Sequence, residues 1–253
     1  MARALSKLGY CSRSQAAELI RAGRVRLNGA VRRDPETPVR LQLDRIRVDE
    51  RPVTSGEKIY LVMNKPRGLV TTTSDEKGRE TVYALLEKAG EVLPWVAPVG
   101  RLDKASEGLL LLTNDSEWGA HVAAPKTHLE KTYHVQIGTV ADEKFAQVLV
   151  NGVKTAEGDF LRARVASLLR SGEKTCWLEI TLDEGKNRHI RRMVAALGFE
   201  VLRLVRVAIG SLQLGELAKG ACRRLTAEEK RLLDHAITNG PGFARKERWR
   251  IDG

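Results

Sequence analysis

The chain has 253 residues, of which 42% are hydrophobic and 30% charged, enough to bury one large core or two smaller ones. Its longest apolar runs, such as residues 109–112, are far shorter than the roughly 20 residues of a membrane span, and its basic N-terminus lacks the apolar segment of a secretory signal. These features exclude the membrane-spanning class and predict a cytoplasmic protein.

The net charge of +11 and the pI near 9.8 point to a polyanionic partner, and nucleic acid is the commonest one. The alternative is a basic protein whose charge serves only solubility. The cysteines are Cys11, Cys176 and Cys222, far apart and without a CxxC pair. This sparse, odd count argues against a disulfide framework and a structural zinc, and favours a reducing compartment.

Residues 1–56 predict a separate small domain. A short helix over residues 3–8 precedes a second helix, for which Ser12 is the N-cap and Gln15 completes a capping box. Gly23 ends that helix. The Asn28-Gly29 pair then predicts a two-residue hairpin turn, and residues 44–49 alternate as a strand.

This first domain carries much of the positive charge. Up to residue 58 there are 13 Lys or Arg against 7 Asp or Glu, so over half of the excess charge lies in under a quarter of the chain. A solvated helix face is one interpretation. The other is a surface that follows RNA phosphates, formed by the second helix and the start of the hairpin: Arg13, Arg21, Arg24 and Arg26.

The same stretch resembles an S4 RNA-binding domain. The resemblance rests on Cys11-Ser12-Arg13-Ser14 through Ile20, on Arg21-Ala22-Gly23-Arg24-Val25, and on Leu27-Asn28-Gly29. It implies a recognition module that presents basic side chains of the second helix and the following turn to structured RNA, and that carries no chemistry.

Residues 57–236 predict a second, larger domain. Strands and helices alternate without a regular βαβ period, which favours an α+β fold with a large, mainly antiparallel sheet flanked by helices. The expected strands cover residues 59–64, 131–137, 160–165, 175–182, 201–207 and 211–214, and the expected helices cover residues 81–88, 114–123, 141–151 and 226–235. Residues 237–253 are rich in Gly and Pro and then basic, which predicts a flexible tail.

A charged segment bracketed by Gly100 and Gly108 precedes the four leucines of residues 109–112, which are typical of a fully buried strand. Asp103 in that segment is a carboxylate in a glycine-bounded loop beside a rigid strand, a good position for chemistry. Taken alone, the stretch fits a structural surface turn better, with Asp103 bonding nearby backbone. A glycosidase-like pair of Asp103 and Glu107 is a further alternative.

The clearest amphipathic helix follows Glu184, with apolar residues at i, i+3, i+4 and i+7 from Ile190. Cations near its start oppose the helix dipole unless an anion lies close by, either an RNA phosphate or a carboxylate. These cations are Lys186, Arg188, Arg191 and Arg192. The chain contains no GxSxG, HExxH, P-loop or GxGxxG motif.

Several motifs of the larger domain together resemble the pseudouridine synthases of the RsuA/RluB/RluE/RluF branch, which modify bacterial ribosomal RNA. In chain order they are Asn64-Lys65-Pro66-Arg67-Gly68, Gly100-Arg101-Leu102-Asp103, the run from Glu107 to Asp115, Lys131-Thr132-Tyr133, and Glu184-Gly185-Lys186-Asn187-Arg188 through Arg191-Arg192-Met193. Two departures are His189, where the family pattern has an amide, and Ala124-Pro125, where it has His-Pro.

The resemblance implies an isomerase that detaches uracil from ribose, turns it and rejoins it through C5, with no cofactor and no metal. It implies that Asp103 is the essential residue, acting on the sugar, on the base or on a ribose proton. Tyr133 would stack on the extruded base and assist deprotonation at C5. Asp103 must be ionised yet poorly solvated, and burial raises a carboxyl pKa, so a paired cation is expected, which by motif is Arg191.

The remaining basic residues of these motifs are expected to contact RNA. Arg101 and Lys104 would steer phosphate or help to extrude the nucleotide. The others are Lys65, Arg67, Lys186, Arg188 and Arg192.

The expected substrate is ribosomal RNA, with a preference for the large subunit, and the expected oligomeric state is a monomer. The alternatives are a small-subunit enzyme, a catalytically silent RNA-binding or ribosome-assembly factor, and an unrelated hydrolase of glycosidic bonds. The sequence does not identify the target uridine.

Overall fold

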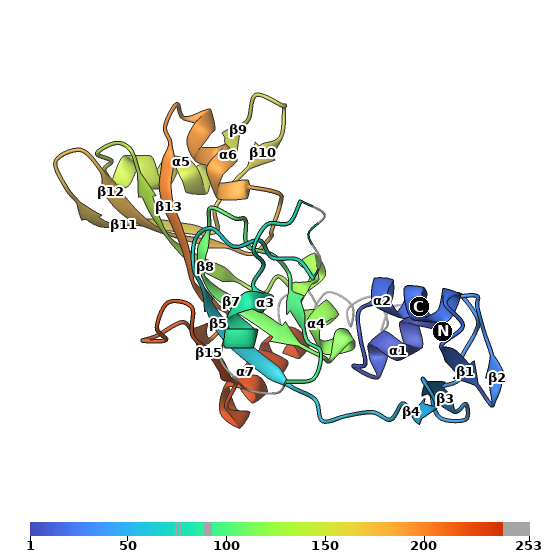
Figure 1. The fold of residues 1–253 in the computed structure, drawn as a ribbon. Helices are drawn as coiled ribbons and strands as arrows, with labels where there is room; N and C mark the ends of the chain where they lie inside the picture. The colour runs from blue at the N-terminus through green and yellow to red at the C-terminus, as the bar shows by residue number, and fades with distance from the viewer. Residues whose placement is uncertain (74, 76, 89–92, 240–253) are drawn as a thin grey trace, which may run out of the picture.

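The computed structural model describes residues 1–73, 75, 77–88 and 93–239, and it forms a small N-terminal domain and a larger second domain (Figure 1). A chain segment after strand β4 (Arg51–Pro52) connects the two. The segment between β4 and the first strand of the larger sheet thus separates the two groups of elements.

The small domain packs two helices, α1 (Ala2–Lys7) and α2 (Arg13–Arg21), beside a four-stranded antiparallel sheet. The strand order is β2 (Ala30–Val31), β1 (Val25–Leu27), β3 (Ile46–Val48) and β4 (Arg51–Pro52). The predicted capping box is present, because the Ser12 hydroxyl accepts from the Gln15 N–H and the Gln15 side chain accepts from the Ser12 N–H. Asn28 and Gly29 both have positive φ angles, 52° and 86°, which the two-residue hairpin turn requires.

The larger domain is built on a twisted sheet of nine strands within the described residues. Along its main path the order is β11 (Val165–Ser171), β12 (Cys176–Leu182), β8 (Lys131–Ile137), β13 (Val201–Ile209), β7 (Glu107–Thr113), β5 (Tyr60–Lys65) and β15 (Cys222–Arg224). In addition, β6 (Ala97–Val99) pairs with β7, and β14 (Leu212–Gln213) pairs with β13. Only the β13–β7 pair is parallel. The expected α+β fold with a mainly antiparallel sheet is confirmed.

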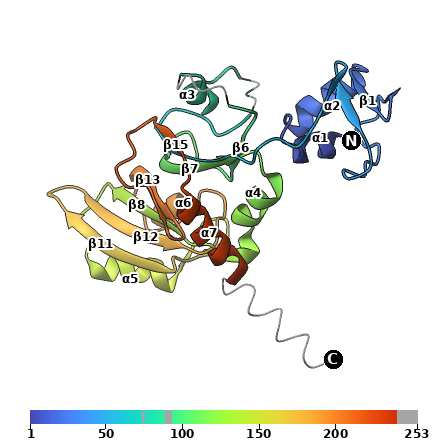
Figure 2. The ribbon, with the colours of Figure 1, turned by 90° about the horizontal axis from the view of Figure 1, so that it is seen from below.

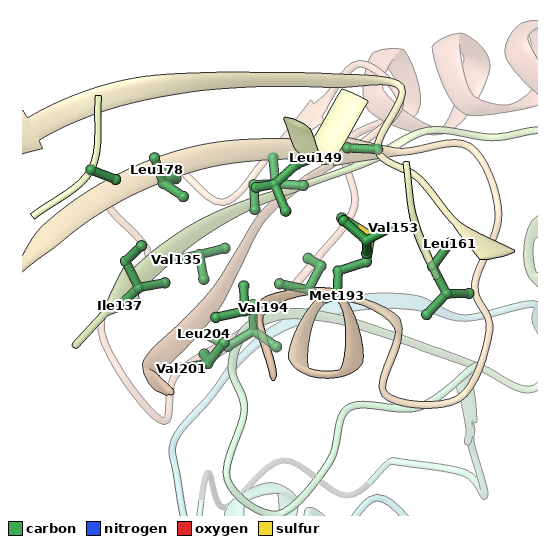
Figure 3. Packing of buried hydrophobic residues seen from close by; sticks show 14 of the residues in the cluster. Val135, Ile137, Leu149, Val153, Leu161, Leu178, Met193, Val194, Val201 and Leu204 are labelled. Atoms are coloured by element: carbon green, nitrogen blue, oxygen red, sulfur yellow. The ribbon is translucent and has the colours of Figure 1, made fainter. Parts of the chain in front are cut away.

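Two helices cover one face of the outer half of this sheet. Figure 2 shows α5 (Glu143–Asn151) along strands β11, β12 and β8. Figure 3 shows Leu149 of α5 and Met193 and Val194 of α6 (His189–Ala196) packed with Val135, Leu178 and Leu204 of the sheet. This apolar cluster fixes α6 against the sheet, and with it the basic segment that precedes the helix.

Strand β7 is buried on both faces, as the four leucines predicted. Leu109 and Leu111 pack with α4 (Ser116–Ala123) and α7 (Ala227–Asn239). Leu110 and Leu112 pack into a second cluster with α3 (Tyr83–Lys88). Every residue of β7 is buried, so the loop before it is attached to a rigid element.

Some expected boundaries are wrong. Residues 160–165 do not form one strand: β10 (Phe160–Leu161) pairs with β9 (Val153–Lys154), and β11 begins in the large sheet at Val165. Helix α7 continues to Asn239, so residues 237–239 are helical and not part of a tail. The rest of the expected tail, residues 240–253, lies outside the described residues.

The two domains meet where the linker joins the larger sheet. The Asn114 side chain accepts from the Ile59 N–H at 2.8 Å and donates to the Glu57 carbonyl at 2.8 Å. Lys7 of α1 forms an ion pair with Glu117 of α4. The linker is therefore tied to the end of β7 at the point where the second domain begins.

None of the helices in the described ranges has both the length and the apolar character that crossing a membrane requires.

The parallel contact between β7 and β13 depends on Gly108, which pairs with Arg206 and has a φ of +100°. A Cβ atom on this residue would lie 2.3 Å from the Arg206 carbonyl oxygen and 2.8 Å from the Arg206 backbone nitrogen. Backbone atoms of a central strand cannot move aside cheaply. We therefore expect Gly108→Ala to destabilise the protein by at least about 3 kcal/mol in denaturant unfolding.

The matched control is Gly138→Ala, where the nearest atom to the added Cβ is 3.8 Å away. Its cost should stay below about 1 kcal/mol. Equal stability of the two variants would contradict the proposed role of the close strand contact.

Candidate functional site

A cavity of about 450 Å³ opens on the larger domain beside Asp103. One wall is the Asp103 loop, residues 100–106, and the opposite wall is the segment of residues 185–190 that starts α6. Strands β8 and β13 contribute Lys131, Tyr133 and Arg206. The volume falls within the range of small-molecule sites and suits a single nucleoside.

The Asp103 loop is held by the fully buried side chain of Lys65, at the end of β5. The Lys65 ammonium donates to the carbonyls of Asp103 at 3.2 Å, Ser106 at 2.8 Å and Pro66 at 3.0 Å. Thr71 further fixes the loop, because its hydroxyl donates to the Leu102 carbonyl at 2.8 Å. Both ends of the loop are therefore anchored by hydrogen bonds to the body of the domain.

Burial lowers the pKa of Lys65 to about 8, although the carboxylates of Glu107 and Asp103 act in the opposite direction. With no exposed surface, this residue cannot contact RNA, and the sequence-based assignment of Lys65 to RNA binding is wrong. The physical reason is that Lys65 is still part of β5, where it pairs with Gly108 of β7, and its side chain lies inside the domain among the carbonyls that accept from it.

The Asp103 side chain is exposed at the wall of the cavity, and no ion pair to it is formed by the described residues. The expectation of a poorly solvated carboxylate is therefore not met in this state. The backbone of Asp103 is instead fixed, since its carbonyl accepts from both Lys65 and the Ser106 N–H.

Arg191 lies near Asp103 but does not form the expected ion pair. Its guanidinium donates to the carbonyl of Ala105 at 3.2 Å and of Val201 at 3.1 Å. Burial lowers the pKa of Arg191, Arg188 lowers it further, and Asp103 has the opposite effect. Arg191 thus adds a positive charge close to Asp103 while it braces the Asp103 loop from behind.

Tyr133 is half-buried on β8 and borders the same cavity as Asp103. Its ring packs against both apolar clusters that flank the cavity, one under α5 and α6 and one under α3. The structure therefore brings Asp103 and Tyr133, 30 positions apart in sequence, to one site.

Three exposed cations, named here the rim cations, line the cavity mouth: Arg101, Lys186 and Arg188. Lys186 also lies 3.4 Å from Glu184. Lys104 lines an adjoining groove that shares Arg101 and Asp103, and exposed Arg67 lies close enough to lower the pKa of Arg191.

Arg192 lies apart from this group. It forms ion pairs with Asp159 and Glu157 and does not line the cavity. Because Arg192 is outside the cavity lining, its assignment to RNA contact has no support from the site.

Glu107 does not join Asp103 as a second carboxylate of the cavity. It is buried at the start of β7, where Arg203 holds it at 3.1 Å and Lys219 at 2.7 Å. Burial alone would raise the pKa of Glu107, but hydrogen bonds from Arg203 and Lys219 outweigh it and lower the pKa overall. A glycosidase-like pair is therefore absent.

The four arginines of the small domain that were expected to follow RNA phosphates fall into two classes. Arg24 pairs with Asp49 and Arg26 with Glu50, whereas Arg13 and Arg21 are exposed on α2 without an ion-pair partner among the described residues. Exposed ion pairs contribute little to stability, about 0–1 kcal/mol, so all four remain available to a polyanion.

Sequence reasoning gave no role to two cations in the cavity, Lys131, which it named only within the Lys131-Thr132-Tyr133 motif, and Arg206. Lys131 precedes Tyr133 by two positions, and the period of a strand places both on one face. Arg206 is a buried charge inside the apolar strand β13. Both signals were present in the sequence, although only the sheet pairing brings the two together.

Among the described residues no cluster of three His, Cys, Asp or Glu side chains is arranged to hold a metal ion.

Comparison with known proteins gives matches over both domains. The S4 domain family matches residues 2–46, and the RNA pseudouridylate synthase family matches residues 59–196. A relative from Aquifex aeolicus (strain VF5), described as an uncharacterized RNA pseudouridine synthase, is 36% identical over 234 residues, 92% of each chain. Ribosomal large subunit pseudouridine synthase B of Bacillus subtilis (strain 168) is 34% identical over 238 residues, covering 92% of this chain and 96% of its own.

A solved structure is also similar. The crystal structure of a pseudouridylate synthase aligns with a TM-score of 0.62 and 30% sequence identity, and the match covers 92% of this chain and 98% of that one. The match thus extends over most of both chains.

The Lys65 anchor can be tested by Lys65→Met, which removes the donor to the carbonyls of Pro66, Asp103 and Ser106 and leaves the buried Ser106 carbonyl without it. At pH 7 we expect a loss of about 1–3 kcal/mol in denaturant unfolding, because buried acceptors left unpaired are costly. Lys88→Met, at an exposed residue of α3, is the control and should change stability by less than about 0.5 kcal/mol.

The pH dependence gives a second readout of the same variant. The folded-state pKa of Lys65, about 8, lies below the ordinary value of 10.5, so between these pH values the unfolded chain binds more protons. Wild-type stability should therefore rise with pH across this window. The rise should be smaller in Lys65→Met, and an unchanged slope would contradict the assignment.

Proposed function

Because this chain belongs to the RNA pseudouridylate synthase family and so isomerises uridine to pseudouridine in RNA, we propose that its substrate is large-subunit ribosomal RNA. The support for the subunit is the relative named ribosomal large subunit pseudouridine synthase B, which matches over both domains. The S4 domain, with its cluster of basic residues, supports a structured RNA as the form that is recognised.

The isomerisation can be written as a balanced exchange of bonds. The C1′–N1 bond breaks, and its electron pair leaves with the uracil. The ring turns, the C5 atom forms the new bond to C1′, and C5 loses a proton while N1 gains one. No atom is added and no redox change occurs, so the catalytic groups only need to stabilise charge, hold the base and move protons.

Asp103 is proposed as the group that acts at the sugar, and Tyr133 as the side chain on which the extruded base stacks. The single observation that carries this proposal is that both residues border one cavity of nucleoside size, with cations at its mouth. The base must leave the RNA stack to reach Asp103, which is the usual route for enzymes that act on a base.

The side chain of Asp103 is exposed to solvent in the structure. A solvated carboxylate is a weak catalyst, so the substrate itself must exclude water from the cavity. We propose that the extruded nucleotide fills the space and that its phosphates meet the rim cations. Asp103 would then be desolvated only when the substrate is bound, with the positive charge of Arg191 close by.

We propose a monomer located in the cytoplasm, where ribosomal RNA and its assembly intermediates are present. One copy of the chain has both parts that the proposal needs. The S4 domain would bind a structured stem of the RNA, and the larger domain would bind the target nucleotide. Most of the affinity should come from phosphate contacts and should decrease with salt.

The test of function uses a host strain without the gene, restored with either wild type or Asp103→Ala. We expect one large-subunit pseudouridine to disappear on deletion and to return with wild type only. In vitro, Asp103→Ala should lower the rate by at least about 10³-fold while its RNA affinity stays unchanged.

The remaining outcomes are distinct. Loss of a small-subunit pseudouridine would overturn the subunit. Binding of ribosomal RNA by wild type with every uridine intact would indicate a silent RNA-binding factor, and release of free uracil would indicate a hydrolase. Wild-type activity of Asp103→Ala would contradict the role of Asp103.

The S4 surface is tested by salt dependence. Removing Arg13 and Arg21 together should weaken RNA binding and reduce the slope of log K against log salt by about 2, because each neutralised phosphate contributes about 0.9 to the slope. The comparison variant replaces Arg24 and Arg26, whose ion pairs with Asp49 and Glu50 compete with phosphate, and should have a smaller effect. A slope identical to that of wild type would exclude α2 from the RNA interface.

A further inference from the structure

The inner part of the cavity contains a second positive group, separate from the rim cations. Lys131 on β8 lines the cavity and forms neither an ion pair nor a side-chain hydrogen bond with the described residues. Arg206 on the neighbouring strand β13 is 5% exposed and also lines the cavity. Its Nε donates to the Leu109 carbonyl at 2.7 Å, and one of its terminal nitrogens is buried without a partner.

This pair of cations has no full counter-charge in the fold. Burial lowers the pKa of Lys131 to about 8, the charge of Arg206 lowers it further, and Asp183 acts in the opposite direction. Asp183 lies beyond the end of β12 and is itself 3.7 Å from His128. A cation held among apolar walls without a partner is costly, so its position calls for an acceptor that the protein does not supply.

The location of the pair relative to Tyr133 suggests what that acceptor is. Lys131 and Tyr133 project from the same face of β8 two residues apart, a separation of about 7 Å, while Arg206 pairs with Tyr133 across the sheet. A pyrimidine stacked on the Tyr133 ring therefore presents its edge to Lys131. That edge bears carbonyl oxygens, which accept hydrogen bonds.

We propose that Lys131 is a further catalytic residue, whose ammonium donates to a carbonyl oxygen of the extruded uracil and stabilises the negative charge that develops on the base as the C1′–N1 bond breaks. Arg206 is a positioning residue that adds positive potential behind Lys131. This inference rests on the proposed function, since it assumes a uridine in the cavity.

The step balances in charge and in atoms. The electron pair of the C1′–N1 bond passes to the uracil, and the resulting anion is delocalised over N1 and the two carbonyl oxygens. Asp103 compensates at the sugar, either through a bond to C1′ that later breaks or by taking and returning a ribose proton. Lys131 keeps its proton throughout and stabilises the anion until C5 attacks C1′.

A phosphate fits this inner position less well. The rim cations at the mouth are exposed, as phosphate contacts require, whereas Lys131 and Arg206 lie beside Leu182, Leu204 and Ile209. A neutral base that becomes anionic during the reaction matches an apolar pocket with one directed donor. Such a donor strengthens its bond in the transition state, which raises the rate rather than the affinity.

The experiment measures tritium release from a large-subunit ribosomal RNA transcript that carries [5-³H]uridine, in single turnover with enzyme in excess. Lys131→Met should lower the rate about 100-fold, the usual effect of losing one donor to a developing anion, and should change the RNA dissociation constant less than twofold. Lys144→Met, at an exposed residue of α5, is the matched control and should retain the wild-type rate.

The pH profile separates catalysis from structural support. Lys131 must be protonated to act, so the wild-type rate should fall as the pH rises through about 8. Lys131→Arg should restore much of the rate and move this alkaline limb to higher pH, since arginine stays charged. A purely structural role of Lys131 would leave the limb in place.

Three results would overturn the inference: a Lys131→Met rate within threefold of wild type, a loss that appears only in RNA affinity, or an alkaline limb that Lys131→Arg does not shift. If wild type releases tritium and Lys131→Met equals it, the inference fails while the proposed function stands. If wild type releases none from ribosomal RNA, both fail.

Discussion

The site depends on one buried ammonium, that of Lys65. It joins the end of strand β5 to the carbonyls of the loop that carries Asp103, so the position of the carboxylate is set by the sheet and not by the loop itself. The cost of burying a lysine is visible in its lowered pKa. In return for this cost, the three hydrogen bonds of Lys65 fix the backbone of the Asp103 loop while RNA is bound.

The central sheet explains why the loop and the opposite wall stay in register. Strand β7 pairs in parallel with β13, and Gly108 allows the two backbones to approach at that point. Strand β13 in turn carries Arg206 and pairs with β8, which carries Lys131 and Tyr133. The Asp103 loop and the floor of the cavity are therefore neighbours through continuous backbone hydrogen bonding.

The basic residues differ in exposure and in partners, and each group of them therefore has a different role. The exposed arginines of the S4 domain and the rim cations can bind phosphates with a salt-dependent affinity. Buried Lys65 serves architecture, and Arg191 braces the Asp103 loop while it keeps a positive charge near the carboxylate. Arg192 is engaged by acidic residues of the β9–β10 region. Of the basic residues in the larger domain, those that line the cavity are the ones placed to act on the nucleotide.

The sequence by itself determined the family resemblance, the capping box at Ser12 and the buried strand after Gly108, and it predicted Asp103 and Tyr133 as members of one site. These features are local patterns or motifs, and short-range geometry and family resemblance are sufficient to predict them. Only the tertiary structure decided where each lysine and arginine points, because long side chains follow packing rather than position in a motif. In the structure Lys65 lies inside the protein, and Arg191 donates to backbone carbonyls and not, as expected, to the Asp103 carboxylate. It also brought Lys131 near Arg206, because the register between β8 and β13 pairs Arg206 with Tyr133 and Ile209 with Lys131, and neither strand alone predicts that proximity.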